Sequence, residues 1–181
     1  YEGVREISDV WQLRFDGVPL PGYGWVFPTG EGTANIGAGY FARGRATSAA
    51  RAFEQFVSNP ALRPMLAHAR QNGPMKGYPL RADFTTAPTH AERILLVGEA
   101  AGLVNPLTGE GIDYALESGR IAAGHIAGML ARDDFSVSAG RAYDAELRDH
   151  FQSLFEFCMF VRDRLCDKAW LLNTLVGVAN R

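Results

Sequence analysis

The sequence predicts a mixed α/β (α+β) fold, on three observations. The first forty residues alternate in the manner of strands, residues 93–98 have the pattern of a buried strand, and most of the remainder shows helical spacing of apolar residues. The 181 residues are 47% hydrophobic, which is enough for a sizeable core and too much for a disordered chain. A formal net charge of −2 argues against general binding to nucleic acid.

Extended runs and tight turns predict an antiparallel hairpin near the N-terminus. Residues 10–15 alternate apolar and polar side chains and lead into an Asp-Gly turn pair at 16–17. Residues 23–28 read as an aromatic-rich strand, the glycines within 29–32 favour a turn, and residues 33–41 read as the returning strand.

Helices and an extended segment are expected next. Ser48 is a suitable N-cap for a helix that ends before Asn59-Pro60. A short helix is expected over about 61–70. Residues 75–80 look extended again, and the proline among them suits an edge strand.

The second half of the chain predicts one strand and three helices. Residues 93–98 place four apolar residues between a charge and a glycine, which is typical of a strand buried on both faces. Helices are expected from about Thr108 to Ala131, from about Ser138 to Leu165, and near residues 170–178. The apolar positions of the first of these helices are Leu116, Ile121, Ile126 and Leu130.

The connection between the predicted strand and the long helix has the pattern of a ligand site. Glu99 directly follows the strand, where open α/β sheets place ligand contacts. Gly109 and Gly111 allow the backbone to approach a ligand closely, and the first amides of the following helix are expected to be free to bind an anion or a polarised carbonyl. The alternative is an ordinary strand–helix connection whose glycines serve only as turns.

This segment resembles the second FAD-binding motif of the flavoprotein hydroxylases and their relatives. The resemblance implies that the acidic residue hydrogen-bonds the ribitol of FAD and that the helix end faces the pyrimidine side of the flavin ring. The family usually has Asp where this chain has Glu99, which changes the reach of the carboxylate. Residues 115–123 continue the resemblance. The candidate cofactor-binding residues are Gly98, Glu99, Gly102, Pro106, Gly109, Glu110, Gly111 and Ile112.

The aromatic strand resembles the substrate-domain motif of the geranylgeranyl reductase family. In this chain the motif reads Tyr23-x-Trp25-x-Phe27-Pro28, followed by residues 34–39. The three aromatic residues share one face of a strand and would suit an isoprenoid chain, so Tyr23, Trp25, Phe27 and Pro28 are the candidate substrate-binding residues. Simple core packing is the alternative. Flavin-dependent halogenases carry a similar strand, with tryptophan in place of Tyr23 and isoleucine in place of Phe27.

The resemblance implies that the chain is the C-terminal portion of a larger flavoprotein. Such proteins begin with a βαβ unit whose GxGxxG motif holds the FAD pyrophosphate, and the near match at residues 37–42 lies on a hairpin strand. We expect part of the substrate domain, an antiparallel sheet with helices, over 1–90. The end of a Rossmann-like FAD-binding domain is expected over 91–132, and C-terminal helices over 133–181. These residues alone are expected to bind FAD weakly or not at all.

The implied function is reduction of double bonds in a geranylgeranyl or other polyprenyl substrate by an FAD-dependent oxidoreductase. Hydride would pass to one alkene carbon and a proton to the other, with NAD(P)H or another reductant as the electron donor. The sequence identifies no catalytic residue and no proton donor. Two alternatives stay open, an FAD-dependent monooxygenase or halogenase on the same scaffold and a non-catalytic lipid-binding module.

The cysteines, the histidines and residues 162–172 bear on the location of the protein and on metal binding. Cys158 and Cys166 form neither a metal motif nor a disulfide framework, so a reducing, cytoplasmic location is expected. The four histidines lack metal-ligand spacing, and no metal is expected. The basic and apolar residues of 162–172 fit either docking on the core or contact with a membrane surface. The sequence carries no signal for the oligomeric state.

Overall fold

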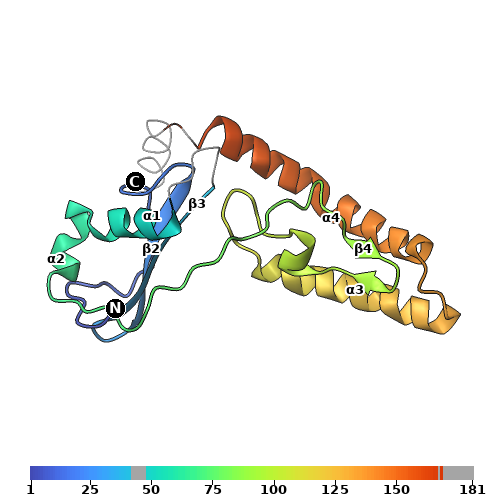
Figure 1. The fold of residues 1–181 in the computed structure, drawn as a ribbon, viewed down its shortest axis with the longest axis horizontal. Coiled ribbons are helices and arrows are strands. Elements are labelled where there is room, and N and C mark those ends of the chain that lie inside the picture. The colour runs from blue at the N-terminus through green and yellow to red at the C-terminus, as the bar shows by residue number, and fades with distance from the viewer. Residues whose placement is uncertain (42–47, 167, 169–181) are drawn as a thin grey trace. The chain divides into compact units, whose positions relative to one another are not determined.

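The computed structural model describes residues 1–41, 48–166 and 168. They form two compact units, one of residues 1–77 together with those from 163 on, and the other of residues 78–162. The units contain both strands and helices, and the mixed α/β fold is confirmed (Figure 1). The division into 1–90, 91–132 and 133–181 stays a prediction.

The first unit contains a three-stranded antiparallel sheet in the order β1-β2-β3. The predicted hairpin is confirmed, because β2 and β3 pair along most of their length and a turn at residues 31–32 joins them. Gly32 has a φ of +63°, a conformation that glycine adopts without strain. The strands are β1 (Gln12–Arg14), β2 (Gly22–Gly30) and β3 (Thr33–Tyr40).

Helix α1 (Ala49–Val57) packs on this sheet. The predicted cap is confirmed, since the Ser48 side chain accepts a hydrogen bond from the Arg51 N–H. A Cβ atom at Gly24 would lie 2.2 Å from the Phe56 ring, so this strand position has room only for glycine. The core of the unit is formed by Val4, Val18, Val26, Ala34, Phe56, Leu62 and Met65.

Two predictions for the first unit need correction. In place of a helix over 61–70 there are a 3-10 turn, η1 (Pro60–Leu62), and a single helical turn, α2 (Arg63–Leu66). Residues 75–80 pair with no strand of the described chain, although Glu2 forms an isolated bridge to Arg70 just before them. Gly73, at a φ of +83°, turns the backbone between these segments.

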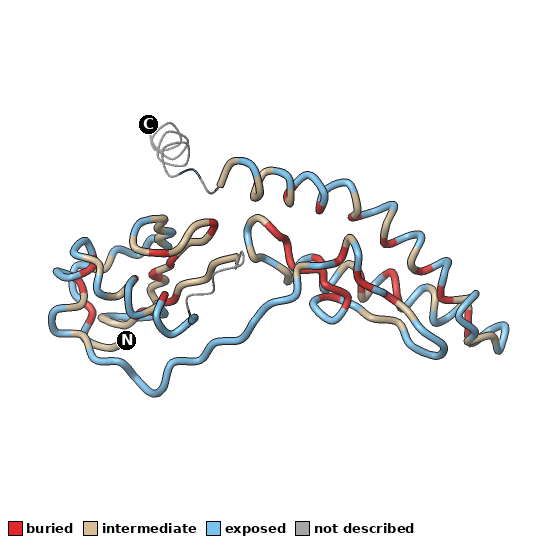
Figure 2. The backbone as a smooth tube through the Cα atoms, turned by 45° about the horizontal axis from the view of Figure 1, so that its top comes forward, coloured by how far each residue is buried: buried red, intermediate tan, exposed pale blue. Residues whose placement is uncertain are grey.

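The second unit is built on two long helices joined by residues 133–136, where Asp133 adopts a left-handed conformation. Both helices contribute to one core cluster, Ile121 and Ala122 from α3 and Tyr143, Leu147 and Phe151 from α4. Figure 2 shows buried stretches, in red, along both helices. Phe84 packs edge-on against Phe151 and Phe155. The elements of the unit are β4 (His90–Ala91), β5 (Ile94–Leu95), η2 (Gly98–Ala101), α3 (Ile112–Arg132) and α4 (Val137–Arg164).

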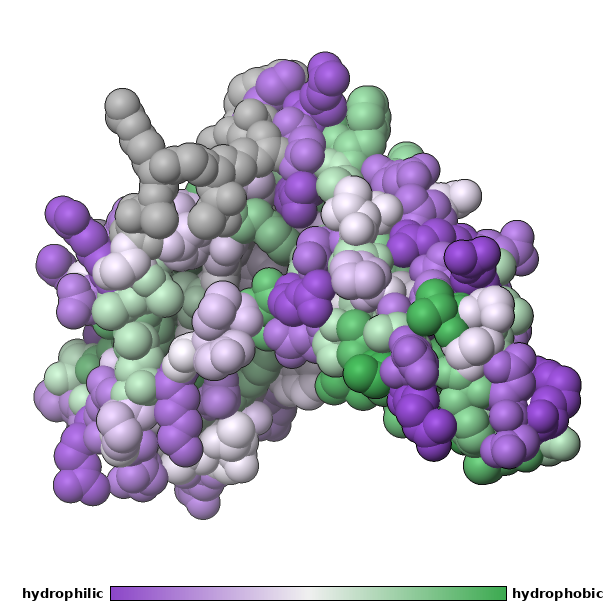
Figure 3. Space-filling model, turned by 45° about the vertical axis from the view of Figure 1, so that its right-hand side comes forward, coloured by the Kyte–Doolittle hydropathy of each residue, from purple (hydrophilic) through white to green (hydrophobic). Residues whose placement is uncertain are grey.

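The predicted apolar face of α3 is only partly buried. Ile121 lies in the core, but Leu116 is 73% exposed and Leu130 is 64% exposed, and Ile126 is exposed as well. Most of the small residues of α3, among them Ala123 and Gly124, are exposed as well. The buried side of the helix combines large and small residues: Tyr114, Ser118, Ile121, Ala122 and Met129. Figure 3 shows hydrophobic residues, in green, at the surface among charged ones.

The predicted helix over 170–178 lies outside the described residues. Among the residues that are described, no helix is long and apolar enough to cross a membrane.

Candidate functional site

The turn after β5 carries the predicted acidic contact. Gly98 has a φ of +53°, and a Cβ atom there would lie 2.9 Å from the Ala115 side chain, so the turn sits directly on α3. The Gly98 N–H donates to the buried Ser118 hydroxyl at 2.9 Å. Leu103 and Gly102 donate back to Gly98 and Glu99, which closes η2 as a compact turn. Glu99 therefore stands exposed on a turn held by the helix behind it.

The strand that leads into this turn differs from the prediction. The sequence predicts a strand buried on both faces over residues 93–98, but β5 has two residues and, within the described part of the chain, pairs only with β4. Ile94 is 52% exposed, and Val97 is also exposed. A run of apolar residues forms a buried strand only where the rest of a sheet and its covering layers surround it. Among the described residues, a single short strand lies beside this run.

The loop from Gly102 to Gly111 is organised by one buried side chain. The Asn105 Oδ1 accepts hydrogen bonds from the N–H groups of Leu107 and Thr108, and the Asn105 amide donates to the Tyr114 hydroxyl at 2.9 Å. Its backbone also pairs with Glu110 and Gly109. Sequence reasoning did not select Asn105, although an asparagine before proline is a common organiser of loops.

The start of α3 is the clearest difference from the prediction. The first amides were expected to be free, but the Glu110 carboxylate accepts from the Ile112 N–H at 2.6 Å and from the Asp113 N–H at 3.3 Å. The Asp113 carboxylate accepts from the Tyr114 N–H. These amides are orphan donors at a positive helix end, so a nearby carboxylate fills the position that an anion would take.

All eight candidate cofactor residues lie in one continuous segment of the second unit. Pro106 is buried within the loop, and Gly109 has a φ of +75°. Gly102 is also left-handed, at +77°. Ile112, the first residue of α3, is exposed beside Glu110. The segment thus brings together an exposed carboxylate, a helix N-terminus and backbone turns at glycine residues.

The candidate substrate residues lie on β2 of the first unit. Tyr23, Trp25 and Phe27 lie on the face opposite α1, because the alternate positions Gly24 and Val26 face Phe56. The rings of Tyr23 and Trp25 are 6.1 Å apart, those of Trp25 and Phe27 are 6.2 Å apart, and Trp11 extends the row at 5.1 Å from Phe27. None of the four aromatic residues belongs to the buried core of that unit. Burial raises the pKa of the Tyr23 phenol, which stays protonated at neutral pH.

Strand β3 has a glycine where the side chain of Trp25 lies across it. Trp25 lies opposite Gly37, and a Cβ atom at Gly37 would lie 2.1 Å from the indole. The indole N–H donates to the Asn35 side chain at 2.8 Å. Pro28 lies near the end of β2, where the pairing with β3 shifts. A cavity of about 400 Å³ opens beside Trp25, lined also by Phe53 of α1 and by residues 71–77.

No protein-family model matches the chain. The sequence is 35% identical over 171 residues to digeranylgeranylglycerophospholipid reductase 1 of Methanopyrus kandleri, a match that covers 91% of this chain and 44% of that protein. It is 38% identical over 119 residues to the menaquinone reductase of Mycobacterium tuberculosis, covering 60% of this chain and 27% of that one. The chain belongs to the geranylgeranyl reductase family.

A solved structure has the same fold as this family member. The geranylgeranyl bacteriochlorophyll reductase-like protein of Thermoplasma acidophilum superposes with a TM-score of 0.73 at 24% identity. The match covers 92% of this chain and 42% of that protein. The chain thus spans less than half the length of the reductases that match nearly all of it.

Proposed function

We propose that the whole protein is an FAD-dependent reductase that saturates double bonds of an isoprenoid lipid. The single observation that carries this proposal is the segment from Gly98 to Ile112, where an exposed carboxylate and a helix N-terminus flank an ordered loop. The matched relatives are named as reductases of a geranylgeranyl lipid and of a quinone, which supports an apolar isoprenoid substrate. Their names support a reductase over a monooxygenase or a halogenase.

The residues of this segment fit the chemistry of FAD. The Ile112 and Asp113 amides already hold a carboxylate oxygen, and the same donors suit the carbonyl oxygen of a flavin ring once Glu110 moves aside. The exposed Glu99 carboxylate suits the hydroxyl groups of a ribityl chain. When bound and reduced, the flavin supplies the hydride for an alkene carbon. We place the cofactor against Glu99, the loop through Pro106 and Gly109, and the start of α3.

The aromatic face of β2 is the proposed wall for the isoprenoid chain. An unactivated alkene offers no charge for the protein to stabilise, so the protein contributes chiefly by holding the chain in position. Tyr23, Trp25, Phe27 and the adjacent Trp11 present flat apolar surface of the kind that holds such a chain. Pro28 follows this row on the strand, where the pairing of β2 with β3 shifts. NAD(P)H or another reductant is the proposed electron donor. No residue is assigned as proton donor.

A cytoplasmic protein that meets its lipid substrate at a membrane surface is the setting we propose. A lipid with long isoprenoid chains resides in a bilayer, so the enzyme must reach it there. This part of the proposal rests on the substrate class and on the basic and apolar residues near 162–172.

The test uses the whole protein purified without detergent or denaturant. A flavin spectrum with absorbance at about 450 nm is expected. Addition of a geranylgeranyl lipid to the anaerobically reduced protein is expected to reoxidise the flavin and to give a lipid product with added hydrogens by mass spectrometry. Protein that retains no flavin after incubation with FAD and removal of the unbound cofactor would overturn both flavoenzyme proposals. A lipid-binding module would then remain.

A matched pair of variants locates the cofactor contact. Glu99→Ala is expected to weaken FAD binding, because it removes the carboxylate of the proposed contact. Glu92→Ala, an exposed glutamate of the same unit, is expected to leave binding unchanged. Equal affinities of the two variants would show that Glu99 does not contact the cofactor.

A further inference from the structure

Residues 81–84 lie directly against the turn that carries Glu99. A Cβ atom at Gly102 would lie 2.7 Å from both the Asp83 carboxylate and the Phe84 backbone nitrogen. At such a distance something must shift, so this face of the turn is filled by residues 81–84 and not by solvent. Both segments belong to the second unit.

Arg81 contacts the turn at two points, one on the Glu99 side chain and one on the backbone. Its backbone N–H donates to the Glu99 Oε1 at 3.3 Å. Its guanidinium donates to the Ala100 carbonyl at 2.7 Å. The remaining nitrogens of the fork pair with both carboxylate oxygens of Asp83, at 3.2 and 3.0 Å. A planar fork held at two points keeps Arg81 in one orientation, which an unpaired arginine on the surface would not have.

The segment that contains Arg81 is itself anchored to α4. Arg148 donates to the backbone carbonyls of Phe84, Thr85 and Ala87 at 2.9 to 3.3 Å. Phe84 is fully buried, and the Arg148 guanidinium lies 5.2 Å from the centre of its ring. The contacts therefore run without a break from a long helix, through residues 83–87, to Arg81 and the Glu99 turn.

We propose that Arg81 and Asp83 are positioning residues that orient the Glu99 carboxylate toward the cofactor. Glutamate has one more rotatable bond than the aspartate usual in the family, so an exposed Glu99 must lose more side-chain freedom when it binds. The Arg81 N–H holds one carboxylate oxygen in advance and leaves the other to meet the ligand. This inference rests on the proposed FAD site and adds to it two residues of a distant stretch of sequence.

The test is a double-mutant cycle on FAD affinity, measured in the whole protein by quenching of flavin fluorescence. Arg81→Ala keeps the backbone N–H but removes the guanidinium contacts to Ala100 and Asp83 that fix its position. It is therefore expected to weaken FAD binding roughly tenfold in the presence of Glu99 and by less than about twofold in a Glu99→Ala background. Asp83→Asn is expected to act in the same direction as Arg81→Ala. Arg81→Lys keeps the charge and one donor for Ala100 and is expected to recover part of the affinity.

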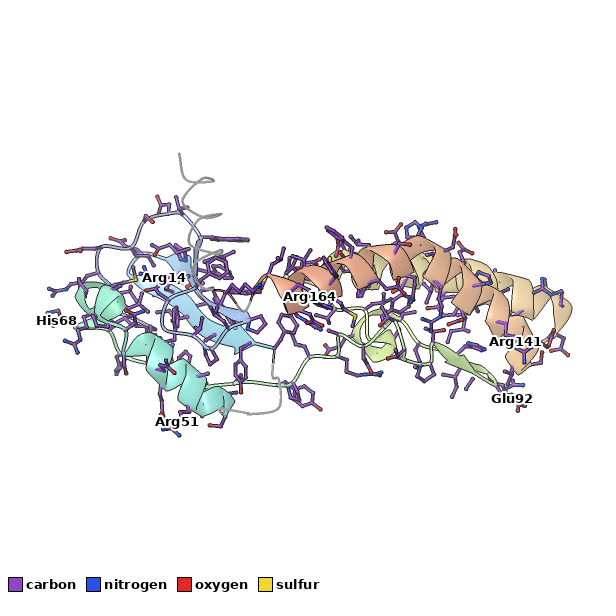
Figure 4. All side chains as sticks on the ribbon, turned by 90° about the horizontal axis from the view of Figure 1, so that it is seen from above. Arg14, Arg51, His68, Glu92, Arg141 and Arg164 are labelled. Atoms are coloured by element: carbon purple, nitrogen blue, oxygen red, sulfur yellow. The ribbon has the colours of Figure 1, made fainter. Side chains whose placement is uncertain are left out.

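A second readout needs no cofactor. Amide hydrogen exchange of residues 98–102 is expected to accelerate in Arg81→Ala, because the Ala100 carbonyl loses its partner. Arg141→Ala is the matched control, since Arg141 is exposed near the start of α4 (Figure 4) and should change neither exchange nor affinity.

The outcomes separate the two proposals. A wild-type protein that fails to bind FAD overturns the proposed function and this inference together. If wild-type protein binds FAD and Arg81→Ala binds it equally well, only the positioning role is overturned. An equal loss in the Glu99 and Glu99→Ala backgrounds would show that Arg81 contacts the cofactor itself and does not act through Glu99.

Discussion

Gly37 is the residue on which the orientation of Trp25 depends. The indole lies across β3 where a Cβ atom at Gly37 would be 2.1 Å away, a distance that no real structure tolerates. Gly37→Ala is expected to push the ring out of place and to lower the free energy of unfolding by about 1–3 kcal/mol. Near-ultraviolet circular dichroism reports the ring environment, and chemical denaturation gives the stability.

Gly39 offers a matched control for this prediction. It lies two residues further along the same strand, and a Cβ atom there would meet only one Trp25 ring atom, at 3.9 Å. Gly39→Ala is expected to leave both measurements unchanged within about 0.5 kcal/mol. Equal behaviour of the two variants would mean that the indole does not rest on Gly37.

Glu110 is expected to compete with the cofactor for the start of α3. Its carboxylate accepts the Ile112 and Asp113 amides, which are the donors proposed for the flavin carbonyl. Glu110→Ala removes a cap, so a loss of about 1 kcal/mol in stability is expected together with tighter FAD binding. Thermal unfolding and flavin titration of the whole protein measure the two effects. Weaker FAD binding would instead identify Glu110 as a cofactor contact.

For single residues, the sequence indicated the type of side chain at the site better than it indicated which backbone groups that side chain contacts. Glu99 and the glycines at 98, 102 and 109 follow from a motif, because Glu99 is exposed and these glycines have the positive φ that their residue type indicates. The roles of Asn105 and Glu110 depend on which backbone N–H groups lie within reach. That reach is set by the loop conformation, which no local pattern specifies.

At the scale of elements, the anchoring of residues 83–89 to α4 has a pH dependence. Burial acts to raise the pKa of Asp144, but hydrogen bonds from Thr89 and Arg148 and the charge of Arg148 outweigh it, so its pKa is lowered. A carboxyl with a lowered folded pKa stabilises the folded state above its unfolded pKa of about 3.9, and this contribution is lost as the pH falls through the folded value. The anchor should therefore weaken in acid.

The expected measurement is the change in unfolding free energy from about pH 5 to pH 2. Asp144→Asn is expected to be less stable at pH 5 and to lose less stability toward pH 2 than wild type, by on the order of 1 kcal/mol. Asp149→Asn, at an exposed position of the same helix, should keep the wild-type slope. A slope that Asp144→Asn leaves unchanged would assign the acid sensitivity to other carboxyl groups.

The bounds of helices with clear capping or terminating residues could be predicted from the sequence, but the buried face of a helix could not. Ser48 and Asn59-Pro60 bound α1 correctly, and the span of α4 was predicted to within about a residue at each end. Of the four large apolar positions predicted on α3, only Ile121 is buried, and the other buried residues are Tyr114, Ser118, Ala122 and Met129. Periodicity identifies apolar stripes but not which of two stripes meets a given neighbour, since that depends on the partner's side chains. The length and exposure of β5 likewise depend on neighbouring strands, which the apolar run at 93–98 does not specify.

At the scale of the molecule, the two sets of candidate residues occupy different units. The proposed cofactor segment and its Arg81 support lie in the second unit, and the aromatic wall lies in the first. Each set is locally ordered by its own contacts: Ser118 and Asn105 in one, Gly37 and Asn35 in the other. A reductase needs both, because cofactor and alkene must be held together for transfer.

Without the rest of a family member's length, this chain is expected to lose most of its affinity for FAD. The chain spans 44% of the Methanopyrus relative, and the proposed contacts comprise the ribityl and ring side of FAD but no motif for its pyrophosphate. The isolated 181 residues are expected to bind FAD at least roughly a hundredfold more weakly than the whole protein, since most of the charged cofactor would remain in water. Equilibrium dialysis of both forms against FAD, with circular dichroism to verify that the short form is folded, measures the ratio. Comparable affinities would show that this segment alone holds the cofactor.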